Sequence, residues 1–358
     1  MTCSASIKLP TTPEEVDAEW LTRALGHSRP GFVVEHAEAL RSLGGACTKL
    51  RLAVRTNDPD FPPTLIVKGC FEPYARETML DWQLKEARSY ARIVPHLPGV
   101  EHIQCFFVQD DETEGSALVM EDLDLRGVTC LKAQEPIASV EIAADFLTSL
   151  AQVHARWWQA SELQDEQMFG FAAKLDALAL PRQQDILSDE VLFAATVGEP
   201  RGAAIPRALK DRRRLLSAIK ALIAQGSQLP VTITHGDMHL ANLYVTADGR
   251  AGLLDWSCWR LPWVHDVSYF LGGCLDVVDR RRWERPLLEH YLSQLGANGV
   301  SAPAWDEAFF AYRCWLFWGM YVWMMNSTHY HSEANITAMT ARYAAAALDH
   351  ATLDLLGV

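Results

Sequence analysis

The alternation of hydrophobic and polar residues in the first part of the chain predicts a small β-sheet. Residues 32–41, 47–55 and 64–69 have the length and composition of strands, and turn-forming residues separate them. Two further segments of this kind, 104–109 and 116–121, flank an acidic turn that ends in glycine. We therefore expect five strands in this region.

Helices are expected beside these strands. Thr12 before Pro13, with Glu15 completing a capping box, is the signature of a helix start, and Gly26 would end that helix. Residues 77–93 repeat apolar side chains at helical spacing. The expected order after the first helix is strand, strand, strand, helix, strand, strand.

From residue 123 onward the pattern is mostly helical. Residues 139–158 predict a long buried helix, and short strands are expected at 231–234, 243–245 and 251–254. We therefore expect an α+β chain of two lobes, residues 1–122 and the mostly helical residues 123–358.

The most apolar segment, 309–325, predicts a buried helix and no membrane span. Arg313 interrupts it, and it is shorter than the roughly 20 residues that a spanning helix needs.

Composition excludes some classes of protein. The chain has 358 residues, of which 49% are hydrophobic and 22% charged, as in ordinary globular proteins. Its net charge of −13 argues against a nucleic-acid partner, because phosphate contacts need clustered Lys and Arg. The acidic surplus weakly favours neutral or cationic substrates.

The eight cysteines are scattered and form no C-x-x-C pair or zinc-like spacing with histidine. The first residues contain no apolar core of a signal peptide. Reduced thiols in a cytoplasmic protein are therefore expected.

The segment that carries candidate chemistry is His-Gly-Asp-Met-His-Leu-Ala-Asn, residues 235–242, followed by Asp255 in an apolar run. Phosphoryl transfer from ATP needs a carboxylate to accept a hydroxyl proton, oxygen ligands for magnesium, and cations to hold phosphates. Asp237 would be exposed on a loop between strands, and Asn242 and Asp255 would supply hard oxygen donors from neighbouring strands of a hairpin.

The alternative is a solvated loop that matches by accident. From average residue frequencies, H-G-D-x-x-x-x-N arises by chance in about one chain in a thousand of this length. The added Asp255 and the hairpin-like spacing favour the functional interpretation.

These residues resemble the aminoglycoside phosphotransferase and choline kinase superfamily, which has a protein-kinase-like fold. The helix around KEARSYARIVPHL points within it to the ecdysteroid-kinase-like branch. The resemblance covers residues 40–275 and implies ATP and Mg²⁺ as cofactors. It implies Asp237 as the catalytic base, with Asn242 and Asp255 as the magnesium ligands.

The resemblance also implies a nucleotide-binding N-lobe, residues 1–122, and a C-lobe, residues 123–358, with the catalytic loop and the substrate pocket. Lys68 in LIVKG matches the lysine that holds the α- and β-phosphates. Its acidic partner is expected to be Glu86, in the family's E-x-x-x-Y pattern, with Glu77 as the rival. Without the resemblance, Lys68 and Glu86 would be an ordinary strand-end lysine and an ordinary surface acid.

Two other segments complete that expected site. Gly44 and Gly45 lie where a loop over the phosphates belongs, since backbone N–H groups approach phosphate only where side chains are small. Glycines also mark most hairpins, so this pair is weak evidence. In LVMEDLD, residues 118–124, the family's adenine-binding hinge would use the Glu121 C=O and the Leu123 N–H.

Three further residues have structural interpretations. His154 resembles a histidine on the helix beneath the catalytic loop, where a buried structural role is expected. His239 would either brace the loop or orient Asp237 and touch substrate. Asp266 resembles the family's structural aspartate, which ties the loop down.

A small-molecule acceptor is expected rather than a protein. No A-P-E follows Asp255, and Gly236 stands where many protein kinases carry an arginine that reads a phosphorylated activation loop. A protein kinase of unusual form and a non-catalytic pseudokinase are the alternatives, the latter disfavoured because the Lys, Asp and Asn of the motifs are all present.

Aromatic residues in the C-terminal helices bear on the acceptor. They could line an acceptor pocket or fill a helical core, with the core favoured. We expect an apolar or amphipathic alcohol, with an aminoglycoside, choline or another amino alcohol as the alternative. The residues concerned are Trp305, Trp315, Trp318, Tyr321 and Trp323.

Overall fold

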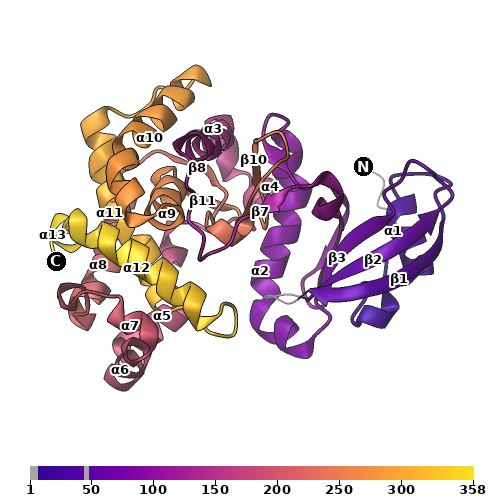
Figure 1. The fold of residues 1–358 in the computed structure, drawn as a ribbon, viewed down its shortest axis with the longest axis horizontal. Helices are drawn as coiled ribbons and strands as arrows, with labels where there is room; N and C mark the ends of the chain where they lie inside the picture. Colours follow the sequence, from indigo (N-terminus) through magenta and orange to yellow (C-terminus); the bar gives the residue numbers. More distant parts are fainter. Residues whose placement is uncertain (1–6, 44–47) are drawn as a thin grey trace. The chain divides into compact units, whose positions relative to one another are not determined.

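The computed structural model describes residues 7–43 and 48–358. The chain divides into two compact units (Figure 1). Unit 1 contains residues up to His96 together with His102–Val128, and unit 2 contains Leu97–Glu101 and Thr129–Val358.

Unit 1 is built on a five-stranded antiparallel sheet with strand order β1-β2-β3-β6-β5. The short β4 (Glu101–His102) precedes β5 along the chain. The predicted order of strands and helix is confirmed. The strands of the sheet are β1 (Val34–Leu43), β2 (Thr48–Thr56), β3 (Thr64–Gly69), β5 (Cys105–Asp111) and β6 (Gly115–Glu121).

The helices α1 (Ala18–Gly26) and α2 (Pro73–Arg92) pack on opposite faces of this sheet (Figure 1). Val67 lies in one hydrophobic cluster with Trp20 of α1. Because side chains alternate along a strand, Lys68 points to the other face, where α2 lies. This alternation gives the lysine its partner on α2.

The expected helix start at Pro13 is wrong. Pro13–Glu15 forms only a short 3₁₀ turn, η1, and α1 begins at Ala18. The Glu15 carboxylate accepts from the backbone N–H of Thr11 at 2.6 Å, so it completes no capping box with Thr12. Asp17 caps α1 instead, accepting from Trp20 N at 2.7 Å.

Unit 2 is mostly helical, as predicted. Within it, α3 packs against α10, and α11 packs against α9 and α12. Its α-helices are α3 (Val140–Arg156), α4 (Glu166–Phe169), α5 (Pro181–Ser188), α6 (Glu190–Gly198), α7 (Pro200–Ala203), α8 (Arg212–Gly226), α9 (Val264–Cys274), α10 (Val277–Ala297), α11 (Trp305–Met324), α12 (Glu333–Asp349) and α13 (Thr352–Leu355). Short 3₁₀ turns in the two units are η2 (Val94–His96), η3 (Leu123–Arg126), η4 (Ser161–Gln164), η5 (Leu175–Leu178), η6 (Arg207–Leu209) and η7 (Leu240–Asn242).

Short strands carry the loops of unit 2. β9 (Leu243–Val245) and β10 (Ala251–Leu253) form the predicted hairpin, and β7 (Thr129–Cys130) pairs with β9. The predicted strand β8 (Val231–Thr234) pairs with β11 (Trp259–Pro262). The sequence pattern did not predict β11. The residues that join β8 to β9 and follow β10 are those of the His-Gly-Asp motif and Asp255.

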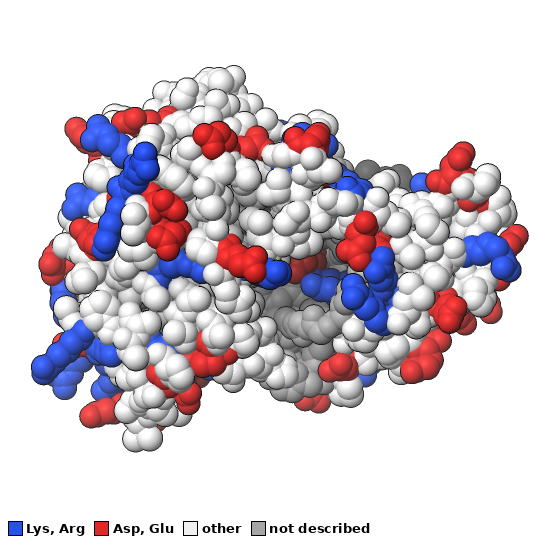
Figure 2. Space-filling view, viewed as in Figure 1, with Lys and Arg blue, Asp and Glu red and all other residues white. Residues whose placement is uncertain are grey.

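Residues 309–324 of the apolar segment belong to the buried helix α11, as expected, and Met325 is its C-cap. Within the described ranges, no helix combines the length and the hydropathy needed to cross a bilayer. On the face drawn in Figure 2, basic side chains are interspersed with acidic ones.

Candidate active site

Asp266 ties down the loop that carries the His-Gly-Asp motif. Its fully buried carboxylate accepts from the backbone N–H of His235 at 2.6 Å and of Gly236 at 3.0 Å. The rings of His154 and His265 lie 3.2 and 3.0 Å from the same carboxylate. The role expected for Asp266, at the start of α9, therefore agrees with its contacts.

His154 lies in this support rather than at the exposed loop. It is fully buried on α3, and its second ring nitrogen lies 2.7 Å from the Tyr291 hydroxyl. Both ring nitrogens are therefore engaged by buried partners, which agrees with the expected structural role.

Gly236 is required where the loop turns. Its φ of +91° lies in the region that residues with a Cβ rarely adopt. An added Cβ would lie 2.1 Å from the carbonyl oxygen of Ser257. The glycine thus lets the loop turn close to the Ser257 backbone immediately before Asp237.

The Asp237 carboxylate is held by neighbours from its own loop. Asn242 donates from its side-chain amide to both the Asp237 Oδ2 and the Asp237 C=O, each at 3.0 Å. His239 Nε2 lies 3.3 Å from the same Oδ2, and His239 Nδ1 accepts from Ala241 N–H at 3.3 Å. His239 therefore both braces the loop and orients Asp237, and its contact with substrate remains a prediction.

Residues from distant helices also surround Asp237. The Tyr269 hydroxyl of α9 accepts from Trp323 Nε1 at 2.7 Å, and burial together with the nearby charge of Asp237 raises the pKa of Tyr269. The ring of His331, which precedes α12, lies 5.5 Å from the His239 ring and 4.9 Å from the Trp323 ring, centroid to centroid. Tyr269 and His331 were not predicted, since neither lies in a motif or near the loop in sequence.

The charges in this cluster keep Asp237 ionised. Burial by itself would raise the pKa of Asp237, but the charge and hydrogen bond of His239 outweigh it and hold this pKa below its usual range. Burial and the charge of His239 lower the pKa of His331 to about 4, so this ring is neutral at pH 7. An ionised carboxylate that is 37% exposed can accept a proton from a bound hydroxyl group.

Asn242 and Asp255 flank the open end of the β9–β10 hairpin. The Leu254 N–H donates to the Asn242 C=O at 2.9 Å, and Asp255 follows directly. Asp255 has a φ of +50°, which is uncommon for a residue with a side chain and often marks a functional position. The hairpin therefore carries both predicted metal ligands.

Lys68 and Glu86 form a buried ion pair within unit 1. Lys68 Nζ lies 2.6 Å from Glu86 Oε2 and 2.7 Å from Oε1, and both residues are 7% exposed. Glu77, the rival partner, is exposed on the same helix. The expected pairing of Lys68 with Glu86 is therefore the one that forms.

The remaining predicted nucleotide residues are Glu121, Leu123, Gly44 and Gly45. Glu121 ends β6, and Leu123 begins the η3 turn that follows. Gly44 and Gly45 lie outside the described residues, so their predicted contact with phosphate remains a prediction.

A family model described as the phosphotransferase enzyme family matches residues 50–310, which include the Lys68–Glu86 pair and the motif from His235 to Asp255. The chain belongs to the phosphotransferase enzyme family. The predicted superfamily is thus confirmed, whereas the ecdysteroid-kinase-like branch remains a prediction. Among curated proteins there is no significant match to this phosphotransferase.

Solved structures share the fold of this phosphotransferase. A Ralstonia eutropha protein, named as a candidate aminoglycoside phosphotransferase, matches with a TM-score of 0.54 at 14% identity, covering 93% of this chain and 96% of its own. A Plasmodium vivax ethanolamine kinase matches with a TM-score of 0.53 at 12% identity, covering 87% and 81%. The α+β, protein-kinase-like fold predicted for the phosphotransferase is confirmed.

The donor set of the phosphotransferase fits a magnesium ion. Among the described residues, no group of three or more His, Cys, Asp or Glu could hold a metal alone. Magnesium instead favours one or two protein oxygens, with phosphate and water completing its shell. Because Asn242 uses its amide nitrogen to bond Asp237, its Oδ1 is the atom that can serve as a ligand beside Asp255.

The burial of the aromatic residues of α11 does not support the alternative that they line an acceptor pocket. Trp315, Trp318, Tyr321 and Trp323 are at most 5% exposed in the phosphotransferase and fill the core around α11. Trp305 stacks on Phe309. The core interpretation, which the sequence favoured, is therefore the better one.

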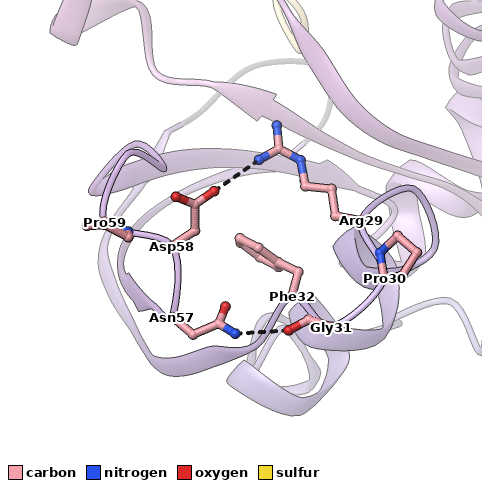
Figure 3. A pocket seen from close by; sticks show the side chains of 7 residues that line it. All are labelled: Arg29, Pro30, Gly31, Phe32, Asn57, Asp58 and Pro59. Atoms are coloured by element: carbon pink, nitrogen blue, oxygen red, sulfur yellow. Dashed lines mark hydrogen bonds and ion pairs between the residues drawn. The ribbon is translucent and has the colours of Figure 1, made fainter.

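A shallow pocket in unit 1 is separate from all predicted site residues (Figure 3). Arg29 lies 3.8 Å from the Asp58 carboxylate there, and Asn57 donates to the Gly31 C=O at 2.9 Å. The polar groups that line it pair with one another, so the pocket is not part of the candidate site.

Proposed function

We propose that this phosphotransferase is a small-molecule kinase that transfers the γ-phosphoryl group of ATP to an alcohol hydroxyl, with Asp237 as the general base. The observation that carries the proposal is the Asp237 carboxylate, ionised and oriented by Asn242 and His239 on a loop that Asp266 holds. Such a carboxylate is the group that phosphoryl transfer to an alcohol needs.

In the proposed reaction, Asp237 accepts the hydroxyl proton while the alcohol oxygen attacks the γ-phosphorus. The bond between the γ-phosphorus and the bridging oxygen of ADP breaks, and the products are a phosphate ester and ADP. His239 and Asn242 keep the carboxylate oxygen directed at the acceptor during proton transfer. Asn242 and Asp255 would hold Mg²⁺, which neutralises charge on the phosphates when bound.

Unit 1 would supply the nucleotide contacts. Lys68, fixed by Glu86, would hold the α- and β-phosphates, and Gly44 and Gly45 would cover them. The Glu121 C=O and the Leu123 N–H would bind adenine. These roles rest on the family motifs, and the Lys68–Glu86 ion pair supports the first of them.

We further propose an apolar or amphipathic alcohol as the acceptor. Three uncharged side chains from other segments lie near the Asp237–His239 pair: the partly exposed His331 and the buried Trp323 and Tyr269. The charged Asp255, which also lies near His239, is assigned to the metal. Glu333, which begins α12 next to His331, is paired with Arg201 through its own carboxylate. A polycationic aminoglycoside would call for several uncompensated carboxylates here.

The test is a side-by-side measurement of ADP release from Mg-ATP with named acceptors. The panel contains a sterol, a phenolic glycoside, choline, ethanolamine and kanamycin, and each is assayed with wild type and Asp237→Asn. We expect the sterol or the phenolic glycoside to give the highest turnover, and Asp237→Asn to reduce it by about 10²-fold or more.

The outcomes separate the parts of the proposal. Near-normal turnover in Asp237→Asn would remove Asp237 as the base. A best response to kanamycin, choline or ethanolamine would overturn the acceptor class and leave the kinase assignment. Binding of Mg-ATP without transfer to any member would favour a pseudokinase.

A further inference from the structure

A carboxylate after β6 connects separate segments of unit 1. Asp122 is only 4% exposed, and its Oδ2 accepts from Arg51 Nε of β2 and from Thr64 Oγ1 of β3, each at 2.7 Å. Its Oδ1 accepts from Asp124 N–H at 3.2 Å and so caps the η3 turn. A buried carboxylate with three donors is fixed in position, because each lost donor would leave charge unsatisfied.

The backbone around Leu123 is held by the same group of contacts. The Asp122 C=O accepts from Leu125 N–H at 3.0 Å, and Gly127, with a φ of +62°, closes the turn. Arg51 also reaches Asp124, at 2.8 Å, so one arginine bonds carboxylates on both sides of Leu123. The turn is therefore anchored immediately before and after this residue.

Glu121 is anchored on the other side of Asp122. Its Oε1 accepts from Gln104 N–H at 2.7 Å and from Arg126 at 3.1 Å. Leu65 of β3 is its partner in the sheet register. The two residues assigned to adenine, Glu121 and Leu123, are thus the chain neighbours of Asp122, which joins this segment to β2 and β3.

We propose that Asp122 is a positioning residue of the nucleotide site: through Arg51 and Thr64 it sets the direction of the Glu121 C=O and the Leu123 N–H. This inference rests on the proposed function, which assigns those groups to adenine. The edge of adenine presents a hydrogen-bond donor and an acceptor side by side. It therefore binds well only if the Glu121 C=O and the Leu123 N–H are already held at the matching spacing. Asp122 contacts no part of the nucleotide itself and acts through the backbone that it holds.

The test compares two probes that differ in the base. Calorimetry measures the Kd of Mg-ATP and of Mg-tripolyphosphate, which lacks adenine and ribose, for wild type and Asp122→Ala. We expect Asp122→Ala to raise the Kd of Mg-ATP about tenfold while the Kd of Mg-tripolyphosphate stays within about twofold. A purely structural role would lower the melting temperature and leave the ratio of the two Kd values unchanged.

Controls keep each outcome informative. Asp110→Ala removes another carboxylate of the same sheet, more exposed than Asp122, which accepts from Arg88 Nε at 2.8 Å, and should leave both Kd values unchanged. If Asp122→Ala does not fold, Arg51→Met removes two of the contacts and should raise the Kd of Mg-ATP alone. An unchanged ratio in both folded variants overturns the inference.

Wild-type results separate this inference from the proposed function. Failure of wild type to bind Mg-ATP would overturn the proposed function itself. Wild type that binds Mg-ATP no more tightly than Mg-tripolyphosphate would overturn the assignment of Glu121 and Leu123 to adenine, and the role of Asp122 with it.

Discussion

Replacing Asp266 by alanine should destabilise unit 2 and disable the Asp237 loop together. The change leaves the backbone N–H groups of His235 and Gly236 buried without their acceptor, and removes the carboxylate between His154 and His265. A hydrogen bond to a charged acceptor contributes about 1.5–3 kcal/mol, and Asp266 is the acceptor of two such backbone bonds. We therefore expect a loss of about 3–5 kcal/mol in the free energy of unfolding.

This loss corresponds to a fall of roughly 6–20 °C in the melting temperature, at about 2–4 °C per kcal/mol for a unit of this size. Thermal unfolding followed by tryptophan fluorescence reports on unit 2, because its core contains Trp256, Trp263, Trp315 and Trp323. Asp266→Asn keeps one acceptor oxygen, so its free energy of unfolding should fall by about half as much. Asp248→Ala, in the exposed hairpin turn, is the control and should change the melting temperature little.

Asp266 also makes the stability of the folded state depend on pH in a defined direction. Burial alone would raise the pKa of Asp266, but hydrogen bonds from His154 and His265 hold it well below the usual range. A carboxylate with a depressed pKa stabilises the folded state above its ordinary value of about 3.9, and this stabilisation is lost as the pH falls toward the folded-state pKa. Wild type should therefore lose stability below about pH 4 more steeply than Asp266→Ala.

The reasoning would be refuted if Asp266→Ala melted within about 2 °C of wild type and kept its phosphotransfer rate. The backbone N–H groups of the loop would then have other acceptors, and Asp237 would not depend on this anchor. A large fall in melting temperature with unchanged turnover at low temperature would refute only the link to Asp237.

Two further predictions concern the separate halves of the reaction. Lys68→Ala and, less severely, Glu86→Ala should raise the KM for ATP or lower turnover by about tenfold or more. Glu77→Ala, on the exposed side of α2, is the control and should change neither quantity. Equal effects of the two glutamate variants would contradict the role of the ion pair. His331→Ala should raise the KM for the best acceptor severalfold without changing the KM for ATP, and the exposed His329→Ala serves as its control in the same steady-state assay.

The sequence by itself determined the local elements and the motif. Strand 64–69 has the predicted bounds of β3, and the expected strands 243–245 and 251–254 pair as β9 and β10, because these patterns act over a few residues. The spacing within 235–242 likewise keeps Asp237 and Asn242 within one loop, where they form a hydrogen bond. Lys68 and Glu86 were paired correctly only because the family pattern was added to the residues.

Only the tertiary structure decided which distant residues surround these motifs. His331 is ninety-two positions after His239, yet their rings touch, and no periodic pattern encodes such a contact. The start of α1 moved from Pro13 to Ala18 because Glu15 accepts from Thr11, a choice that helix-start signals leave open. The aromatic residues of α11 could have lined a pocket or filled a core, and packing against α9 and α12 settled this, because burial depends on neighbours that composition does not specify.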